Sequence, residues 1–146
     1  MAGLIALCLS FVLSQFYRTF LAVLDAVLAS DIGMSPTQLA YASAAWFVAF
    51  ALFQFPVGYL LDTLGPRRTA AYLFFGFAGG GALLFSQATN PGLVIVAMGL
   101  IGIGCSSALM SPMYILIRTL EPAKFTTAMS IFITFGLLGN IASTEP

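Results

Sequence analysis

The first apolar run of this 146-residue sequence contains two charged residues, Arg18 and Asp25, and, close to Arg18, the polar residues Gln15 and Tyr17. If this run lies in lipid, a charge near its centre costs at least about 2.5–3.5 kcal/mol, so the side chain normally faces a cavity or a partner. Arg18 is a candidate for binding an anion through the fixed fork of donors on its guanidinium group. Two other interpretations stay open: an ion pair with an acid on another helix, and a side chain that reaches the interface.

Asp25 and Gln54 are the other candidates for chemistry inside apolar runs. Asp25 follows Arg18 by seven residues, or about 10 Å along a helix, and is a candidate for proton coupling on the condition that burial favours its neutral form. The simpler interpretation of Asp25 is a solvated residue at the mouth of the helix. A second apolar run carries Trp46, Phe50 and Gln54 on one broad stripe. Because aromatic stripes more often pack than bind ligands, Gln54 is the cavity candidate of that stripe.

The sequence contains no recognisable set of residues for catalysis or metal binding. It has no histidine, which removes histidine-based metal sites and histidine general bases. No paired acids stand at close helical spacing and no serine has a nearby base, so we expect neither an enzyme nor a cofactor. Cys8 and Cys105 lie in apolar runs, where small buried thiols are favoured over a disulfide. Zero net charge and the lack of a basic patch with interleaved aromatics argue against a nucleic-acid partner.

The elements that position these residues are expected to lie in lipid. Hydrophobic residues make up 60% of the chain and charged residues 7%, whereas soluble domains carry about 25% charged residues. A spanning helix needs about 20 mostly apolar residues, and charges and turn residues divide the chain into segments of about that length. We predict an all-α integral membrane protein with about five transmembrane helices, over residues 3–28, 37–61, 69–85, 92–117 and 123–142.

Turn residues and basic residues set the predicted ends and orientation of these helices. Pro36 suits the first turn of the second helix, with Ser35 as its cap, and Asn90-Pro91 breaks the chain before the fourth. Basic residues occupy only two of the four junctions: Arg67 and Arg68 follow the second helix, and Arg118 and Lys124 follow the fourth. This positive-inside pattern predicts a cytoplasmic amino terminus and an inner or plasma membrane location.

Small residues recur at spacings of three or four in the last three predicted helices, which lets helix backbones approach closely in lipid. We interpret them as packing residues rather than as direct substrate contacts. They include Gly76, Gly79, Gly80, Gly81, Gly99, Gly102, Gly104, Gly136 and Gly139.

The junction after the second helix has a more specific spacing, with Gly58, Asp62, Gly65, Arg67 and Arg68. Gly58 and Asp62 are one turn apart on the same helix face, and Gly65 can take the positive φ that a tight turn needs. This segment resembles the loop signature of the major facilitator superfamily, G-x-x-x-D-R/K-x-G-R/K-R/K. In that family the loop gates the cytoplasmic side, and the aspartate makes contacts that differ between inward-open and outward-open states.

Other segments extend the resemblance and also mark departures from it. Thr63 replaces the basic residue that follows the aspartate, and Met98 stands at the arginine position of a pattern R-x-x-x-G-x-G that ends in Gly102-Ile103-Gly104. The run from Gln15 to Arg18 resembles the first helix of anion-handling branches of the family. The stretch from Gly136 to Pro146 resembles a glycine-rich, proline-ended fifth helix.

The resemblance implies the amino-terminal part of a secondary transporter that moves a small, possibly anionic, solute by alternating access. We expect an incomplete six-helix bundle that lacks its sixth helix. Its expected partners are the missing carboxyl-terminal half, the lipid bilayer, and a small-molecule or ion substrate. The alternative is a small stand-alone membrane protein that assembles with partner helices without transporting. The predicted substrate-binding residues are Gln15, Tyr17, Arg18 and Gln54, and the predicted gating residues are Gly58, Asp62, Gly65, Arg67 and Arg68.

Overall fold

The computed structural model describes the backbone of residues 2–144 and the side chains of 5–138, 140 and 141. Pro146, which the sequence assigned to the end of the fifth helix, lies outside these residues. The described chain is helical throughout apart from short turns, so the all-α fold class is confirmed. The helices are α1 (Ala2–Val23), α2 (Asp25–Asp31), α3 (Pro36–Leu64), α4 (Pro66–Ala71), the π-helix η1 (Tyr72–Gly79), α5 (Gly80–Ser86), α6 (Pro91–Thr119) and α7 (Pro122–Thr144).

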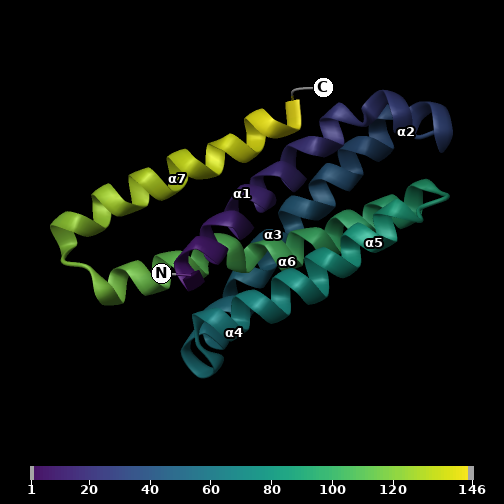
Figure 1. Ribbon diagram of the computed structural model, residues 1–146. Helices are drawn as coiled ribbons and strands as arrows, with labels where there is room; N and C mark the ends of the chain where they lie inside the picture. The colour runs from purple at the N-terminus through teal and green to yellow at the C-terminus, as the bar shows by residue number, and fades with distance from the viewer. Residues whose placement is uncertain (1, 145–146) are drawn as a thin grey trace.

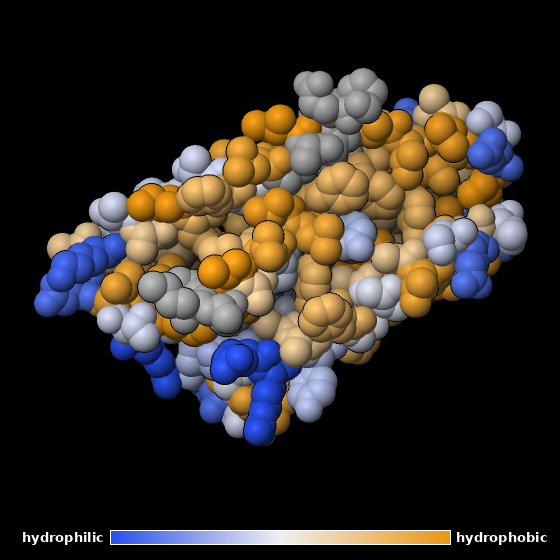
Figure 2. Space-filling model, viewed as in Figure 1, coloured by the Kyte–Doolittle hydropathy of each residue, from blue (hydrophilic) through white to orange (hydrophobic). Residues whose placement is uncertain are grey.

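Four segments of the described chain are long and apolar enough to cross a membrane: Ile5–Val23, Pro36–Leu64, Pro66–Ser86 and Pro91–Thr119. A shorter apolar stretch, Pro122–Leu138, lies in α7. Apolar side chains cover the middle of the visible face and polar ones gather toward its ends (Figure 2). This distribution is the one expected of side chains that face lipid rather than water.

The first predicted helix, over residues 3–28, is divided in two at Leu24. Leu24 has φ −84° and ψ 2°, values of the bridge region rather than of a helix, and α2 begins at Asp25. A carboxylate is favoured at the first turn of a helix, and Leu28 of α2 is buried against the core. Since the sequence has neither proline nor glycine here, this break depends on tertiary packing.

The predicted turn chemistry is confirmed at three helix ends. Ser35 caps α3 in a reciprocal capping box, in which its hydroxyl accepts from the Gln38 N–H at 3.3 Å and its own N–H donates to Gln38 Oε1 at 2.9 Å. Asn90 caps α6 by accepting from the Leu93 N–H at 2.9 Å. Gly65, between α3 and α4, has φ +81°, a conformation that favours glycine.

Helix α6 lies at the centre of the bundle and packs against α1, α3, α4, η1, α5 and α7 (Figure 1). Its glycines make two of these contacts close: a Cβ at Gly102 would meet the backbone of Trp46, and one at Gly104 would meet the backbone of Ala78. Helix α7 lies along α1 and apart from α4 and α5. Residues of α1, α3, α6 and α7 together line one cavity.

Candidate functional site

A cavity of about 310 Å³ opens between these four helices, and we call it the Arg18 cavity. Its volume lies at the lower end of the range for small-molecule sites. The residues that line it are Phe11, Ser14, Gln15 and Arg18 of α1, Trp46, Phe47 and Phe50 of α3, Leu109 of α6 and Ile133 of α7.

Arg18 supplies the charge of this cavity. Its guanidinium carbon lies 5.8 Å from the centroid of the Phe47 ring, within the range of a cation–π contact. Among the described residues it forms no ion pair, since the two pairs found there are Arg118–Asp62 and Lys124–Glu121. The structure therefore does not support the interpretation of Arg18 as one half of an ion pair within the described chain.

Two polar side chains next to Arg18 are almost fully buried. Ser14 and Trp46 are each 5% exposed, and the polar groups of both side chains lie within hydrogen-bonding reach of the buried Cys105 thiol. Trp46 belongs to the buried core together with Ala78 and Cys105, so the sequence interpretation of Trp46 as a packing residue is confirmed.

The four residues predicted to bind substrate do not all meet in this cavity. Gln15 and Arg18 are three residues apart and share a helix face, so both line it. Tyr17 lies on another side of α1, where it packs edge-on against Phe16 and Phe20. Gln54 lies one turn of α3 beyond Phe50 and does not line the cavity. A substrate contact from either of these two residues stays a prediction.

Asp62 lies in a second polar group, at the end of the bundle where α3 and α6 both finish. The Tyr114 hydroxyl donates to Asp62 Oδ1 at 3.0 Å, and an Arg118 nitrogen lies 3.7 Å from the same oxygen. The Arg118 guanidinium carbon lies 4.2 Å from the centroid of the Tyr114 ring. We call these three residues the Asp62 cluster. The contact between Asp62 and Arg118 brings the basic junctions after α3 and after α6 to the same end of the molecule.

The sequence analysis used Arg118 only for orientation and did not single out Tyr114. Their spacing of four residues puts both on one face of α6 just before its end at Thr119. The junctions after the second and fourth predicted helices lie on the same side of a membrane. Together with the spacing of four residues, this placement could have linked Tyr114 and Arg118 to Asp62. The contact joins residues 52 positions apart, so it depends on the packing of α3 against α6.

The other predicted gating residues lie around this cluster without joining it. A Cβ built at Gly58 would meet nothing within 4 Å, so the surface beside Asp62 is open. Arg67 and Arg68 are exposed, and neither forms an ion pair among the described residues. The part of the gate that these two arginines would form stays a prediction.

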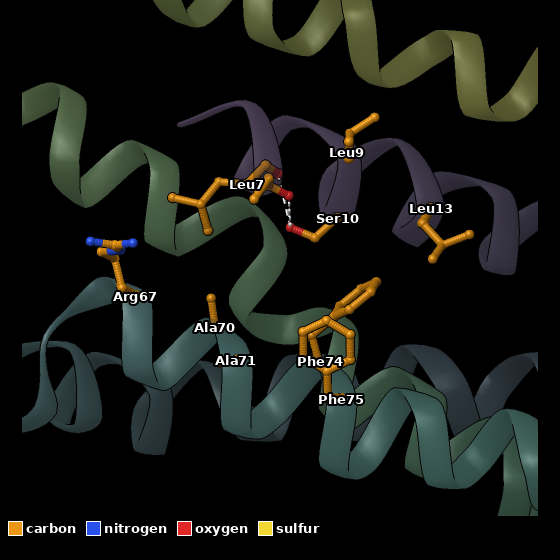
Figure 3. Close-up of a pocket in the computed structure, with 10 residues that line it drawn as sticks. Leu7, Leu9, Ser10, Leu13, Arg67, Ala70, Ala71, Phe74 and Phe75 are labelled. Atoms are coloured by element: carbon orange, nitrogen blue, oxygen red, sulfur yellow. Dashed lines mark hydrogen bonds between the residues drawn. The ribbon is translucent and has the colours of Figure 1, made fainter. Parts of the chain in front are cut away.

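Arg67 instead borders a separate hollow of about 390 Å³ between α1 and the α4–η1 segment (Figure 3). Leucines of α1 face Ala70, Ala71, Phe74 and Phe75 across it. Its single hydroxyl, on Ser10, is bonded to the carbonyl oxygens of Ala6 and Leu7 within its own helix. Apart from Arg67 this hollow offers no free polar side chain among the described residues, whereas the Arg18 cavity also holds the Gln15 amide, so the hollow is the poorer solute site.

Asp25 lies away from both polar groups, exposed in α2. The described helices do not bury Asp25, although burial was the condition for its role in proton coupling. Among the described residues no group of three histidine, cysteine or acidic side chains could hold a metal ion.

Comparison with known proteins places the chain in a family. The family model described as Major Facilitator Superfamily matches residues 6–144, which include α1 from its second turn, the Asp62 junction and all of α6. No individual curated protein matches the sequence. Because the family match extends over nearly the whole chain, the chain belongs to the Major Facilitator Superfamily of membrane transporters.

Proposed function

We propose that this chain forms the first helices of a secondary transporter that moves a small anionic solute by alternating access, without catalysing a reaction. One observation carries the anionic part of the proposal. Arg18 lies in the apolar segment Ile5–Val23, lines a cavity between four helices, and has no acidic partner among the described residues. A guanidinium group in a membrane segment is costly without a counter-ion. A bound anionic solute would neutralise its charge and accept its hydrogen bonds.

The Asp62 cluster supports the alternating-access part of the proposal. A gate must close and open in every transport cycle, so its contacts have to be weak enough to break. The side chains of Arg118 and Asp62 are 65% and 67% exposed, and ion pairs between exposed side chains contribute about 0–1 kcal/mol. Two basic junctions at this end of the bundle fit the cytoplasmic side. We therefore propose a cytoplasmic gate at Asp62 and a cytoplasmic amino terminus.

Uptake into proteoliposomes by the complete gene product tests the proposal. A panel of radiolabelled organic and inorganic anions identifies the solute, after which Arg18→Ala and Arg18→Lys are compared with wild type. We expect Arg18→Ala to abolish or sharply reduce uptake while membrane expression stays intact. We expect Arg18→Lys to recover part of it, because a lysine keeps the charge and loses the two-pronged geometry.

Lys124→Ala is the matched control, since Lys124 pairs with Glu121 at the surface, three residues away. Uptake that persists in Arg18→Ala with unchanged apparent affinity would end the anion-binding proposal. If no anion or other solute is taken up at all, the alternative of a membrane protein that assembles with partner helices without transporting is favoured instead.

A further inference from the structure

We infer that the Arg18 cavity is built for a monovalent organic anion with an apolar body, such as an aromatic monocarboxylate, and that the Gln15 amide is its second hydrogen-bond donor. The inference rests on the proposed function and narrows its substrate class. It excludes inorganic anions, dianions and neutral aromatic compounds as preferred ligands.

Charge limits the ligand to one negative group. Arg18 carries the only charge among the nine residues that line the cavity. A ligand with two negative groups would leave one of them without a cation in a cavity bordered by membrane helices, where an uncompensated charge is strongly disfavoured. A neutral ligand would leave Arg18 itself uncompensated.

The donors around Arg18 suit the two oxygens of a carboxylate. An arginine fork binds a carboxylate with two parallel hydrogen bonds. Gln15 is three residues from Arg18 on the same face of α1 and adds an amide donor to the cavity. A carboxylate has about four lone-pair positions, so it can accept from Arg18 and from a second donor together.

Apolar groups form the rest of the wall. Phe11, Phe47, Phe50, Leu109 and Ile133 line the cavity without offering a polar side-chain atom. The rings of Trp46 and Phe50 are stacked, with centroids 5.1 Å apart and planes 13° apart, so part of this wall is a fixed apolar surface. An inorganic anion would leave this surface wet, whereas a ring placed on it removes apolar area from water and can stack.

The sole tryptophan of the chain provides the assay. Because Trp46 lines the cavity, its fluorescence reports binding there directly. The full 146-residue chain in lipid nanodiscs is titrated with benzoate, with the neutral analogue benzamide, with the dianion isophthalate, and with acetate and nitrate as anions without a ring. We expect benzoate to change the fluorescence saturably, and each of the other four to require at least about tenfold higher concentration.

Variants separate the two parts of the inference. Arg18→Gln should weaken benzoate binding at least about tenfold, because it removes a hydrogen-bonded ionic contact. Phe50→Ala should weaken benzoate binding and leave acetate binding unchanged. Lys124→Gln, remote from the cavity, should leave both unchanged, and circular dichroism establishes that each variant keeps its helices.

Each alternative result contradicts a different statement. If acetate or nitrate binds as tightly as benzoate and needs Arg18, the apolar-body inference is wrong while the proposed anion site stands. If benzamide binds as tightly as benzoate, the anion requirement is wrong and the proposed function fails with it. If benzoate gives no saturable change in a folded chain, the inference is overturned, and the uptake panel then decides the proposed function independently.

Discussion

A methyl group added at Gly104 has no room in this bundle, whereas the same group added at Gly99 has ample room. A Cβ at Gly104 would contact the backbone nitrogen of Ala78 and lie 2.7 Å from its Cα, which real Cβ atoms essentially never do. A Cβ at Gly99, in the same helix, would meet nothing within 4 Å. The pair Gly104→Ala and Gly99→Ala therefore tests the close approach of α6 to η1.

The difference between the two variants isolates the steric effect. Both replace a helical glycine by alanine and gain about 0.5–1 kcal/mol from the lower flexibility of the chain, so this gain cancels in the comparison. Overpacking of a well-packed core costs about 1–3 kcal/mol. At roughly 2–4 °C per kcal/mol for a chain of this size, we expect Gly104→Ala to melt about 2–12 °C below Gly99→Ala.

The measurement is thermal unfolding of both variants and wild type in one detergent, followed by circular dichroism. Gly81→Ala serves as a second test position, because a Cβ there would lie 2.9 Å from the Ala97 carbonyl oxygen and the Ile101 nitrogen. Equal melting temperatures for Gly104→Ala and Gly99→Ala would refute the close packing of α6 against η1.

Three further predictions follow from single contacts. Asp62→Asn should slow transport by the complete gene product with little change in apparent affinity and less than about 1 kcal/mol in stability, because its ion pair with Arg118 is exposed; a wild-type rate would remove the gating role. Tyr114→Phe should reproduce part of that defect, since it removes the hydroxyl that donates to Asp62 and keeps the ring beside Arg118; uptake kinetics identical to wild type would contradict this. Ser35→Ala should lower stability by about 1 kcal/mol in thermal unfolding, because it deletes the cap that accepts from Gln38; an unchanged melting temperature would show that the cap is dispensable.

Local chemistry explains which parts of the fold could be predicted from sequence. The capping box at Ser35 and the positive φ of Gly65 involve residues at most three positions apart, so residue type and spacing were sufficient. The apolar segments follow from composition, because lipid requires each spanning element to satisfy its own backbone hydrogen bonds. The break at Leu24 was not predicted, since no proline or glycine stands there. The π-helix between Tyr72 and Gly79 was not predicted either, because its glycines Gly76 and Gly79 were interpreted as packing residues.

The candidate site divides in the same way. Arg18 and Asp62 could be identified from sequence alone, because a charge in an apolar run and a spaced loop motif are both recognisable from the order of residues. The sequence did not reveal the partners of these two residues: Tyr114 contacts Asp62 from another helix, and Phe47 contacts Arg18 from α3. Sequence spacing decides which residues share a face of one helix, but which faces of different helices meet is decided by side-chain packing. In this protein the close approach of α6 to α3 at Gly102 brings Trp46 and Tyr114 to their places.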